Sequence, residues 1–266
     1  MFVELQYGKY WVEDTGEGIP ILALHGFTGS HRTWDFLKKR NRYRVISLDL
    51  PGHGKTDVKR TLSMDMVCEE LHYLLAVLNL SSVYVIGYSM GGRIALSFAN
   101  YYPDQVRALV LESSSPGIKE KEDRYFRIEK DEQLAQMLEH HGIESFVDFW
   151  ESIPLFETQQ HLPISIQQRI REERLQHTAL GLAASLRGIG TGSQPSWWDS
   201  LSTLSIPVQL IVGDRDTKFV QIANAMKEKL LSCACIVVRN VGHAVHVEDP
   251  EFFDTIVHDF LLNQID

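Results

Sequence analysis

Short apolar runs alternate with helix-like patterns through the first half of the chain. Four runs are typical of strands buried on both faces, at residues 21–24, 43–48, 83–86 and 106–111. Apolar residues recur at helical spacing over 64–80, and 93–102 has the pattern of a second helix that stops before Pro103. This alternation predicts an α/β fold in which helices cover both faces of a mostly parallel sheet.

The pattern changes near residue 116. From there to residue 198 no good strand pattern occurs, and the segment is rich in charge and helical in period. Pro154, Pro163 and the glycines around 188–192 interrupt it. The segment therefore predicts several helices separated by short breaks.

Strand and helix patterns resume after this segment, at 208–212, 235–238 and about 251–262. The simplest interpretation is one sheet domain, built from 1–115 and 199–266, with 116–198 inserted into it. A helical insertion over the carboxyl ends of the strands would act as a lid on a site located there.

Charge limits the classes of partner. The chain of 266 residues is 44% hydrophobic and has a formal net charge of −9. A nucleic-acid-binding surface needs basic patches, so nucleic acid is not an expected partner. A small anionic substrate would need a local basic pocket inside this acidic protein.

Cysteine usage and the N-terminal residues indicate the compartment. The three cysteines, Cys68, Cys233 and Cys235, form no C-x-x-C pair, which disfavours disulfides and a zinc site and favours a reducing cytosol. Residues 1–14 lack the basic start and apolar run of a signal peptide. No window approaches 18 uninterrupted apolar residues, so no membrane span is expected. We expect a cytoplasmic protein without a metal site.

The stretch GYSMGGR, residues 87–93, places Ser89 in a G-x-S-x-G motif. The motif follows a predicted strand directly and precedes a predicted helix directly, which is the context of a nucleophile elbow. The glycines allow a sharp turn, and the helix N-terminus supplies positive potential at the serine. The alternative is a passive serine in a glycine-rich turn.

A reactive serine needs a base and an orienting carboxylate. His243 follows the last predicted strand and Gly242 closely, and His246 is its rival in the same loop. Asp214 and Asp216 both follow the preceding strand, and either could instead be a helix N-cap or a turn former. Four further histidines lie in the charged insertion and are interpreted as surface residues: His140, His141, His161 and His177.

Two backbone N–H groups are candidates for an oxyanion hole. The loop at 25–29 follows the first buried strand, which suits donation from the N–H of Phe27, and the N–H of Met90 would be the second donor. The turn at 51–54, PGHG, also follows a strand. It is interpreted as a glycine-rich loop with no chemical role.

Five motifs in this order resemble the α/β-hydrolase superfamily. They are His25-Gly26 after a strand, DLPGHG at 49–54, the elbow at 87–92, GDRD at 213–216 and Gly242-His243. The resemblance covers nearly the whole chain outside the predicted lid. In that superfamily the acid is usually the last Asp of G-x-x-D, which selects Asp216, and the order Ser, Asp, His also matches.

Arg93 distinguishes this elbow from that of most superfamily members, which carry a small or apolar residue there. One interpretation is that Arg93 caps or pairs on its own helix. However, a buried unpaired guanidinium near Ser89 would be costly, and an anionic substrate would pair it. Arginine suits bidentate carboxylate binding, so Arg93 indicates an anionic substrate.

One branch of the superfamily is closely similar in four stretches, namely GYSMGGR, ESSSPG at 112–117, GDRDTKF at 213–219 and GHAVH at 242–246. It is the family of 2-succinyl-6-hydroxy-2,4-cyclohexadiene-1-carboxylate synthases of menaquinone biosynthesis. The resemblance implies that arginines bind substrate carboxylates and that aromatic side chains line the pocket. The residues assigned to substrate binding on this basis are Arg93, Arg127, Arg174, Tyr88, Trp150 and His25.

The resemblance implies a lyase without a cofactor. Its substrate would be a cyclohexene that carries succinyl, carboxylate and enolpyruvyl groups, and pyruvate would be eliminated from it. Ser89, deprotonated by His243, would act as a base rather than as an acylated nucleophile. Two alternatives remain open, a hydrolase of an anionic ester or carbon–carbon bond and a catalytically idle fold used for binding.

Overall fold

A computed structural model describes residues 1–40 and 42–264 of the chain. Within these residues the sheet follows the order β1-β2-β4-β3-β6-β7-β8-β9, and β5 pairs with β2. The strands are β1 (Phe2–Glu4), β2 (Gly8–Thr15), β3 (Ile19–Leu24), β4 (Tyr43–Leu48), β5 (Asp57–Val58), β6 (Val83–Tyr88), β7 (Val106–Glu112), β8 (Val208–Gly213) and β9 (Cys233–Val238). All pairs from β4 to β9 are parallel, as the apolar runs predict.

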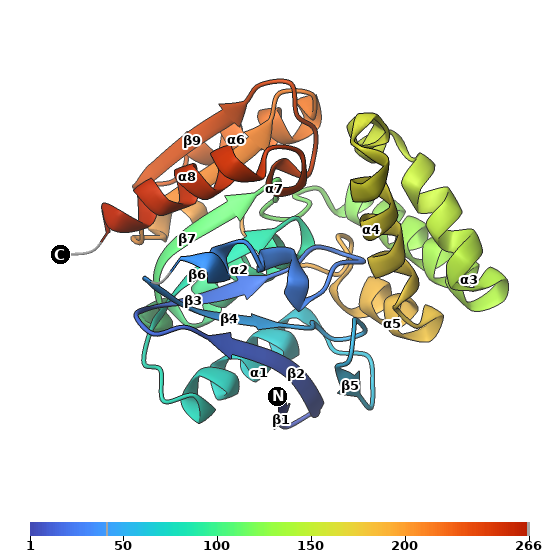
Figure 1. The fold of residues 1–266 in the computed structure, drawn as a ribbon, viewed down its shortest axis with the longest axis horizontal. Coiled ribbons are helices and arrows are strands. Elements are labelled where there is room, and N and C mark those ends of the chain that lie inside the picture. Colours follow the sequence, from blue (N-terminus) through green and yellow to red (C-terminus); the bar gives the residue numbers. More distant parts are fainter. Residues whose placement is uncertain (41, 265–266) are drawn as a thin grey trace.

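Helices cover both faces of the sheet (Figure 1). One face packs against α1 (Met64–Val77), α2 (Met90–Tyr101) and α6 (Thr217–Lys227), and the other packs against α7 (Val245–Glu248) and α8 (Pro250–Leu262). Alternate residues of β3 point to opposite faces: Leu22 and Leu24 join the first layer, and Ile21 and Ala23 join the second. This two-sided burial explains why the central strands are continuously apolar.

The segment that interrupts the sheet is built from helices and short connecting loops. It contains α3 (Lys121–Ser152), the 3-10 segment η4 (Pro154–His161), α4 (Ile164–Leu175) and α5 (Ala179–Ile189), with no strand among residues 116–198. Figure 1 shows these helices as a group on one side of the sheet. They have a small apolar core of their own, centred on Leu138, Phe146 and Leu182. A break at Gly142, where φ is 77°, was not predicted.

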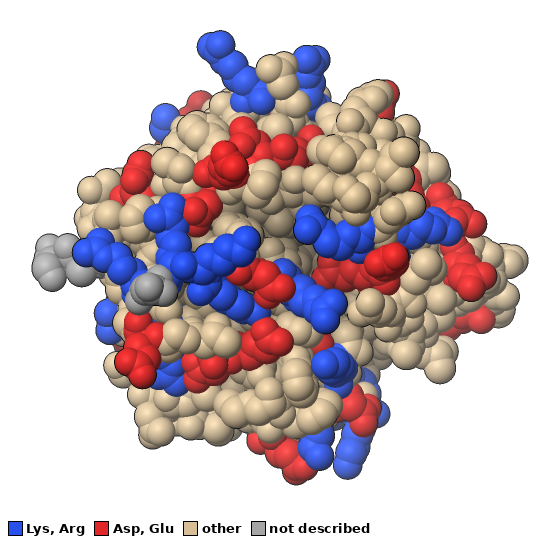
Figure 2. Space-filling view, in the orientation of Figure 1, with Lys and Arg blue, Asp and Glu red and all other residues tan. Residues whose placement is uncertain are grey.

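Acidic and basic side chains are interspersed over the face shown in Figure 2. That face therefore carries no broad basic surface of the kind that nucleic acid requires. Among the described residues, no helix is both long and apolar enough to cross a membrane.

Candidate functional site

Ser89 lies on a strained turn between β6 and α2. Its backbone has φ 48° and ψ −106°, a conformation that a non-glycine residue adopts rarely. The turn is possible because Gly87 and Gly91 approach other backbone very closely; a Cβ on Gly91 would lie 2.1 Å from the carbonyl oxygen of Leu24. The predicted elbow is thus present, and it presents Ser89 at the carboxyl end of the sheet.

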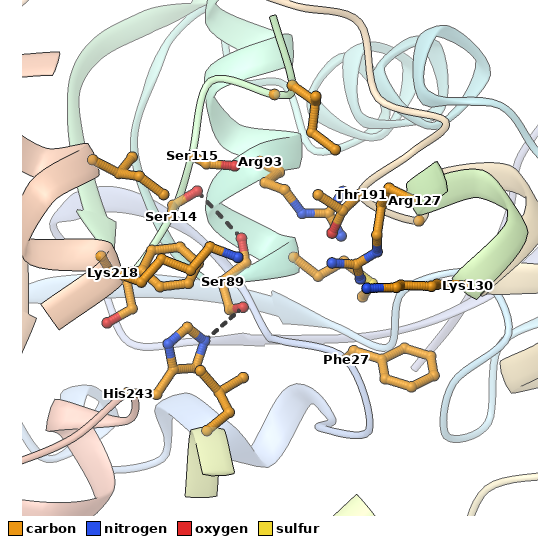
Figure 3. A pocket seen from close by; sticks show the side chains of 18 of the residues that line it. Phe27, Ser89, Arg93, Ser114, Ser115, Arg127, Lys130, Thr191, Lys218 and His243 are labelled. Carbon is orange, nitrogen blue, oxygen red and sulfur yellow. Dashed lines mark hydrogen bonds between the residues drawn. The ribbon is translucent and has the colours of Figure 1, made fainter. Parts of the chain in front are cut away.

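His243 connects Ser89 to a carboxylate. Its Nε2 lies 3.0 Å from Ser89 Oγ (Figure 3), and its Nδ1 lies 2.6 Å from Asp216 Oδ2. The other carboxylate oxygen of Asp216 accepts a hydrogen bond from the N–H of Phe219 at 3.2 Å and caps α6. Asp216 therefore caps α6 and contacts His243 at the same time, so its geometry fits both interpretations that the sequence left open.

The rival residues have other partners. Asp214 Oδ1 accepts a hydrogen bond from the N–H of Asn240 at 2.8 Å, and its side chain is 37% exposed. His246 is buried, and its Nδ1 lies 2.8 Å from Glu112 Oε2. Neither side chain is bonded to Ser89 or His243, so the geometry selects Asp216 and His243.

A cavity of about 450 Å³ opens beside Ser89. Strand ends and the helical segment line it together, and Ser89, His243, Phe27 and Met90 are all part of its wall. Among the described residues, the backbone N–H groups of Phe27 and Met90 have no hydrogen-bond partner. They remain available to a developing oxyanion, as the predicted oxyanion hole requires.

Arg93 is 7% exposed and lines this cavity. Its Nη1 donates to the carbonyl oxygen of Ile189 at 2.8 Å, and no carboxylate of the described residues forms a salt bridge with it. Burial, with a smaller contribution from the like charge of Arg127, lowers the pKa of Arg93 to about 10. The guanidinium is thus charged at neutral pH, and no carboxylate of residues 1–40 and 42–264 contacts it directly.

Three more basic side chains line the same cavity. Figure 3 shows Arg127 and Lys130 on the same side of Ser89 as Arg93, and Lys218 on the other side. Arg127 Nε donates to Asp131 Oδ1 at 2.8 Å, which fixes the side chain along α3. Sequence reasoning missed both lysines, although Lys130 shares a helix face with Arg127 at i+3 spacing. One carboxylate, that of Asp123, also lines the cavity.

The two predicted pocket aromatics lie in the cavity wall. The ring of Tyr88 is 5.4 Å from that of His243, centroid to centroid. Trp150 stacks on Phe146 at 5.5 Å and meets Phe27 edge-on at 5.4 Å. The Nε1–H of Trp150 is buried and has no partner among the described residues.

Arg174 does not reach this cavity, contrary to the prediction. It is 6% exposed, its Nη1 lies 3.3 Å from Glu151 Oε1, and its Nη2 donates to Gln159 Oε1 at 3.2 Å. Its guanidinium lies 4.8 Å from the ring centroid of Phe156, a residue that does line the cavity. Phe156 therefore screens Arg174 from Ser89, and Glu151 already supplies its counter-charge.

His25 does not contact the cavity either, so its assignment to substrate binding was wrong. It is fully buried, and both ring nitrogens are used: Nε2 accepts from the N–H of Leu50 at 2.9 Å, and Nδ1 donates to the carbonyl oxygen of Gly26 at 2.7 Å. Burial is the main cause that lowers the pKa of His25 to about 4. It is a neutral structural link between two loops.

We expect His25 to make the fold sensitive to acid. The unfolded state protonates this imidazole near pH 6.5, whereas the folded state does so only near pH 4. The unfolded state therefore binds more protons below pH 6.5, and stability falls as pH drops, by about 2 kcal/mol at pH 5 from this group alone. Urea unfolding at pH 7.5 and pH 5 measures the loss. A His25→Gln variant should lose less over that range, and an equal loss would contradict the assignment.

The interpretation of His177 as a surface residue was also wrong. It is 4% exposed and lies between α4 and α5, where it contacts loops of the sheet domain. The sequence suggested a surface position for His177 because the residues next to it are polar and solvent-facing. By contrast, His140, His141 and His161 are exposed, as predicted.

Comparisons with known proteins identify the family of the chain. The α/β-hydrolase fold family matches residues 19–250. A Bacillus subtilis (strain 168) protein is 44% identical over 95% of this chain and 94% of its own length, and its name provisionally gives the activity of 2-succinyl-6-hydroxy-2,4-cyclohexadiene-1-carboxylate synthase. An Enterobacter sp. (strain 638) protein that carries this synthase name outright is 31% identical, and the match covers 88% of each chain.

Solved structures show the same fold. MenH from S. aureus superposes with a TM-score of 0.91 at 36% identity and covers 98% of this chain and 99% of its own. A thermophilic esterase from Thermogutta terrifontis superposes with a TM-score of 0.87 at 24% identity, over 99% of both chains. The second similarity concerns the fold alone, because the two sequences have diverged too far to indicate a shared substrate.

Proposed function

The chain belongs to the α/β-hydrolase fold family, and from this premise we propose that it is a pyruvate-eliminating lyase of menaquinone biosynthesis. Its substrate would be 2-succinyl-5-enolpyruvyl-6-hydroxy-3-cyclohexene-1-carboxylate, and its product 2-succinyl-6-hydroxy-2,4-cyclohexadiene-1-carboxylate. The observation that carries this proposal is Arg93, a buried cation that lines the cavity of Ser89 and has no salt bridge to a carboxylate in the part of the chain that the structure describes. A substrate carboxylate would supply the missing counter-charge.

Ser89 and His243 perform the proton transfer in this proposal. His243 accepts the hydroxyl proton at Nε2, and Asp216 stabilises the imidazolium that forms. The Ser89 oxygen removes the ring proton beside the succinyl ketone. The electron pair moves through the ring, the double bond shifts, and the C–O bond to the enolpyruvyl group breaks. Pyruvate leaves as its enolate, which takes up a proton.

The developing negative charge resides on the ketone oxygen of the succinyl group. The N–H groups of Phe27 and Met90, which have no hydrogen-bond partner within residues 1–40 and 42–264, would donate to it. Because the serine acts as a base, no acyl-enzyme is formed.

The substrate has three carboxylates, and the cavity offers four basic side chains. We assign carboxylate contacts to Arg93 and Arg127, with Tyr88 and Trp150 packing against the ring and its substituents. Lys130 and Lys218 add positive charge on either side of Ser89. Arg174 could join them only if Phe156 moved, and His25 takes no part.

Residues 116–198 are proposed to act as a lid. Two of the basic side chains in the cavity, Arg127 and Lys130, come from α3, and Ile189 at the end of α5 holds Arg93. Closure of this segment would complete the basic wall around the substrate and exclude water.

A direct assay tests the proposal. The substrate is generated in place by the enzyme that precedes this step, and pyruvate release is followed beside hydrolysis of a simple aryl ester. We expect pyruvate release well above its spontaneous rate, slow ester hydrolysis, and a return to the spontaneous rate in a Ser89→Ala variant. Efficient ester hydrolysis without enhanced pyruvate release would instead support a serine hydrolase of an anionic ester.

A further inference from the structure

Thr28, the residue after Phe27, has a strained backbone that two histidines hold in place. Its φ is 66°, the left-handed region that β-branched residues avoid. Its N–H donates to His53 Nε2 at 3.2 Å, and its carbonyl oxygen accepts from His177 Nε2 at 2.9 Å. The two polar backbone groups of Thr28, which belong to consecutive peptide units, therefore both bond to imidazole rings.

The remaining ring nitrogens fix the tautomers and extend the network. His53 Nδ1 donates to the carbonyl oxygen of Pro51 at 3.1 Å, and His177 Nδ1 accepts from the N–H of Gly54 at 3.0 Å. Each ring accepts a hydrogen bond on one nitrogen and must be neutral. Burial is the main cause that lowers the pKa of both histidines, which keeps them neutral at physiological pH.

His25 completes a row of three buried rings. Its ring centroid lies 4.9 Å from that of His53, which lies 5.2 Å from that of His177. Three separate segments meet in this row: the loop at 25–29, the turn at 51–54 and the junction between α4 and α5. His177 is the member of the row that belongs to the helical segment.

We propose that His177, acting through Thr28, is a positioning residue that sets the N–H of Phe27 for catalysis. The Thr28 carbonyl belongs to the peptide unit of residues 28–29, and the N–H of Phe27 belongs to that of residues 26–27. One peptide unit, whose N–H donates to His53, lies between them, so a rotation at Thr28 is transmitted through that unit to the N–H of Phe27. Through His177, which does not line the cavity, the helical segment thereby contributes to the oxyanion hole, and displacement of the α4–α5 junction misplaces the donor. This inference rests on the proposed function, in which Phe27 N–H is an oxyanion donor.

Two substitutions at the same site separate the two hydrogen bonds. His177→Gln places an amide N–H near the position of Nε2 and keeps the bond to Thr28. His177→Asn is one methylene shorter, so it can accept from Gly54 but cannot reach Thr28. A matched control is Glu173→Ala, which removes another link from α4 to this region, the hydrogen bond donated by Ser30 Oγ to Glu173.

We expect His177→Asn to lower kcat for pyruvate release about 10-fold with less than a threefold change in KM, because a donor is displaced rather than lost. His177→Gln and Glu173→Ala should stay within about threefold of the unaltered enzyme in kcat. Hydrogen exchange at the amides of residues 26–29, followed by mass spectrometry, should rise in His177→Asn and not in the other two variants. Thermal unfolding of each variant verifies that it is folded.

The outcomes are distinguishable from a failure of the proposed function. Unchanged exchange in His177→Asn overturns the inference, as does faster exchange with unchanged kcat, or an equal loss of kcat in Glu173→Ala. If the unaltered enzyme fails to accelerate pyruvate release, the proposed function fails instead. In that case the role of His177 is tested by the hydrogen-exchange comparison and by the kcat for the aryl ester, because ester hydrolysis needs the same oxyanion donors.

Discussion

Asp216→Asn is expected to lower kcat for pyruvate release by about 10³- to 10⁴-fold. In the native site the carboxylate lies 2.6 Å from His243 Nδ1 and requires the proton there, which leaves Nε2 free to accept from Ser89. An asparagine amide can donate to Nδ1 instead. The proton would then sit on Nε2, and the histidine could no longer act as a base toward the serine. Steady-state kinetics of pyruvate release measure the loss.

Asp214→Asn is the matched control, because it changes the same residue type two positions earlier. Asp214 contacts the backbone of Asn240 rather than His243, and we expect kcat within about twofold of the unaltered enzyme. Both variants should fold, since asparagine also serves as an N-cap for α6 at the position of Asp216. Equal losses in the two variants would refute the assignment of Asp216 as the orienting acid.

Arg93→Met is expected to lower kcat/KM for the anionic substrate by about 10²- to 10³-fold, since hydrogen bonds to charged groups in buried sites are among the strongest. Methionine keeps much of the side-chain volume and removes the charge and the donors. Unfolding stability should stay the same or rise, because the charged form of Arg93 is disfavoured by burial: lowering its pKa from 12.5 to about 10 corresponds to about 3 kcal/mol.

If Arg93→Met lowers activity without lowering stability, Arg93 has a binding role rather than a structural one. The control is Arg187→Met, which removes an exposed arginine paired with Glu132 and Glu139 outside the cavity, and activity should then be retained. If Arg93→Met lowered the free energy of unfolding by several kcal/mol while leaving kcat/KM unchanged, Arg93 would be a structural residue held by Ile189.

The central sheet was predictable because its strands are buried on both faces. Such strands must be apolar at consecutive positions, and that pattern is visible without any knowledge of partners. β2 escaped prediction: its residues alternate between buried and half-exposed positions, as in an antiparallel strand with one solvated face. The elbow was also predictable, because Gly87, Ser89 and Gly91 form one local turn whose geometry depends on adjacent residues.

The errors concern side chains whose partners are distant in sequence. Arg174 has a partner in Glu151 on another helix, and His177 reaches Thr28, which is 149 residues away. Composition around both residues is polar, so nothing local indicates that they are buried. The choice between His243 and His246 depended on position in the loop alone, because nothing in the sequence links His246 to the buried carboxylate of Glu112, which is 134 residues away.

The three buried histidines are neutral, so the row that they form contributes no positive charge. His25, His53 and His177 join three segments beneath the oxyanion loop without adding a cation there. A lysine or arginine in their place would compete with the cavity for the carboxylates of the ligand. The ligand could then bind in an unreactive orientation. With uncharged links behind the loop and four basic side chains in the cavity wall, electrostatic attraction would favour one orientation of the proposed substrate as well as its binding.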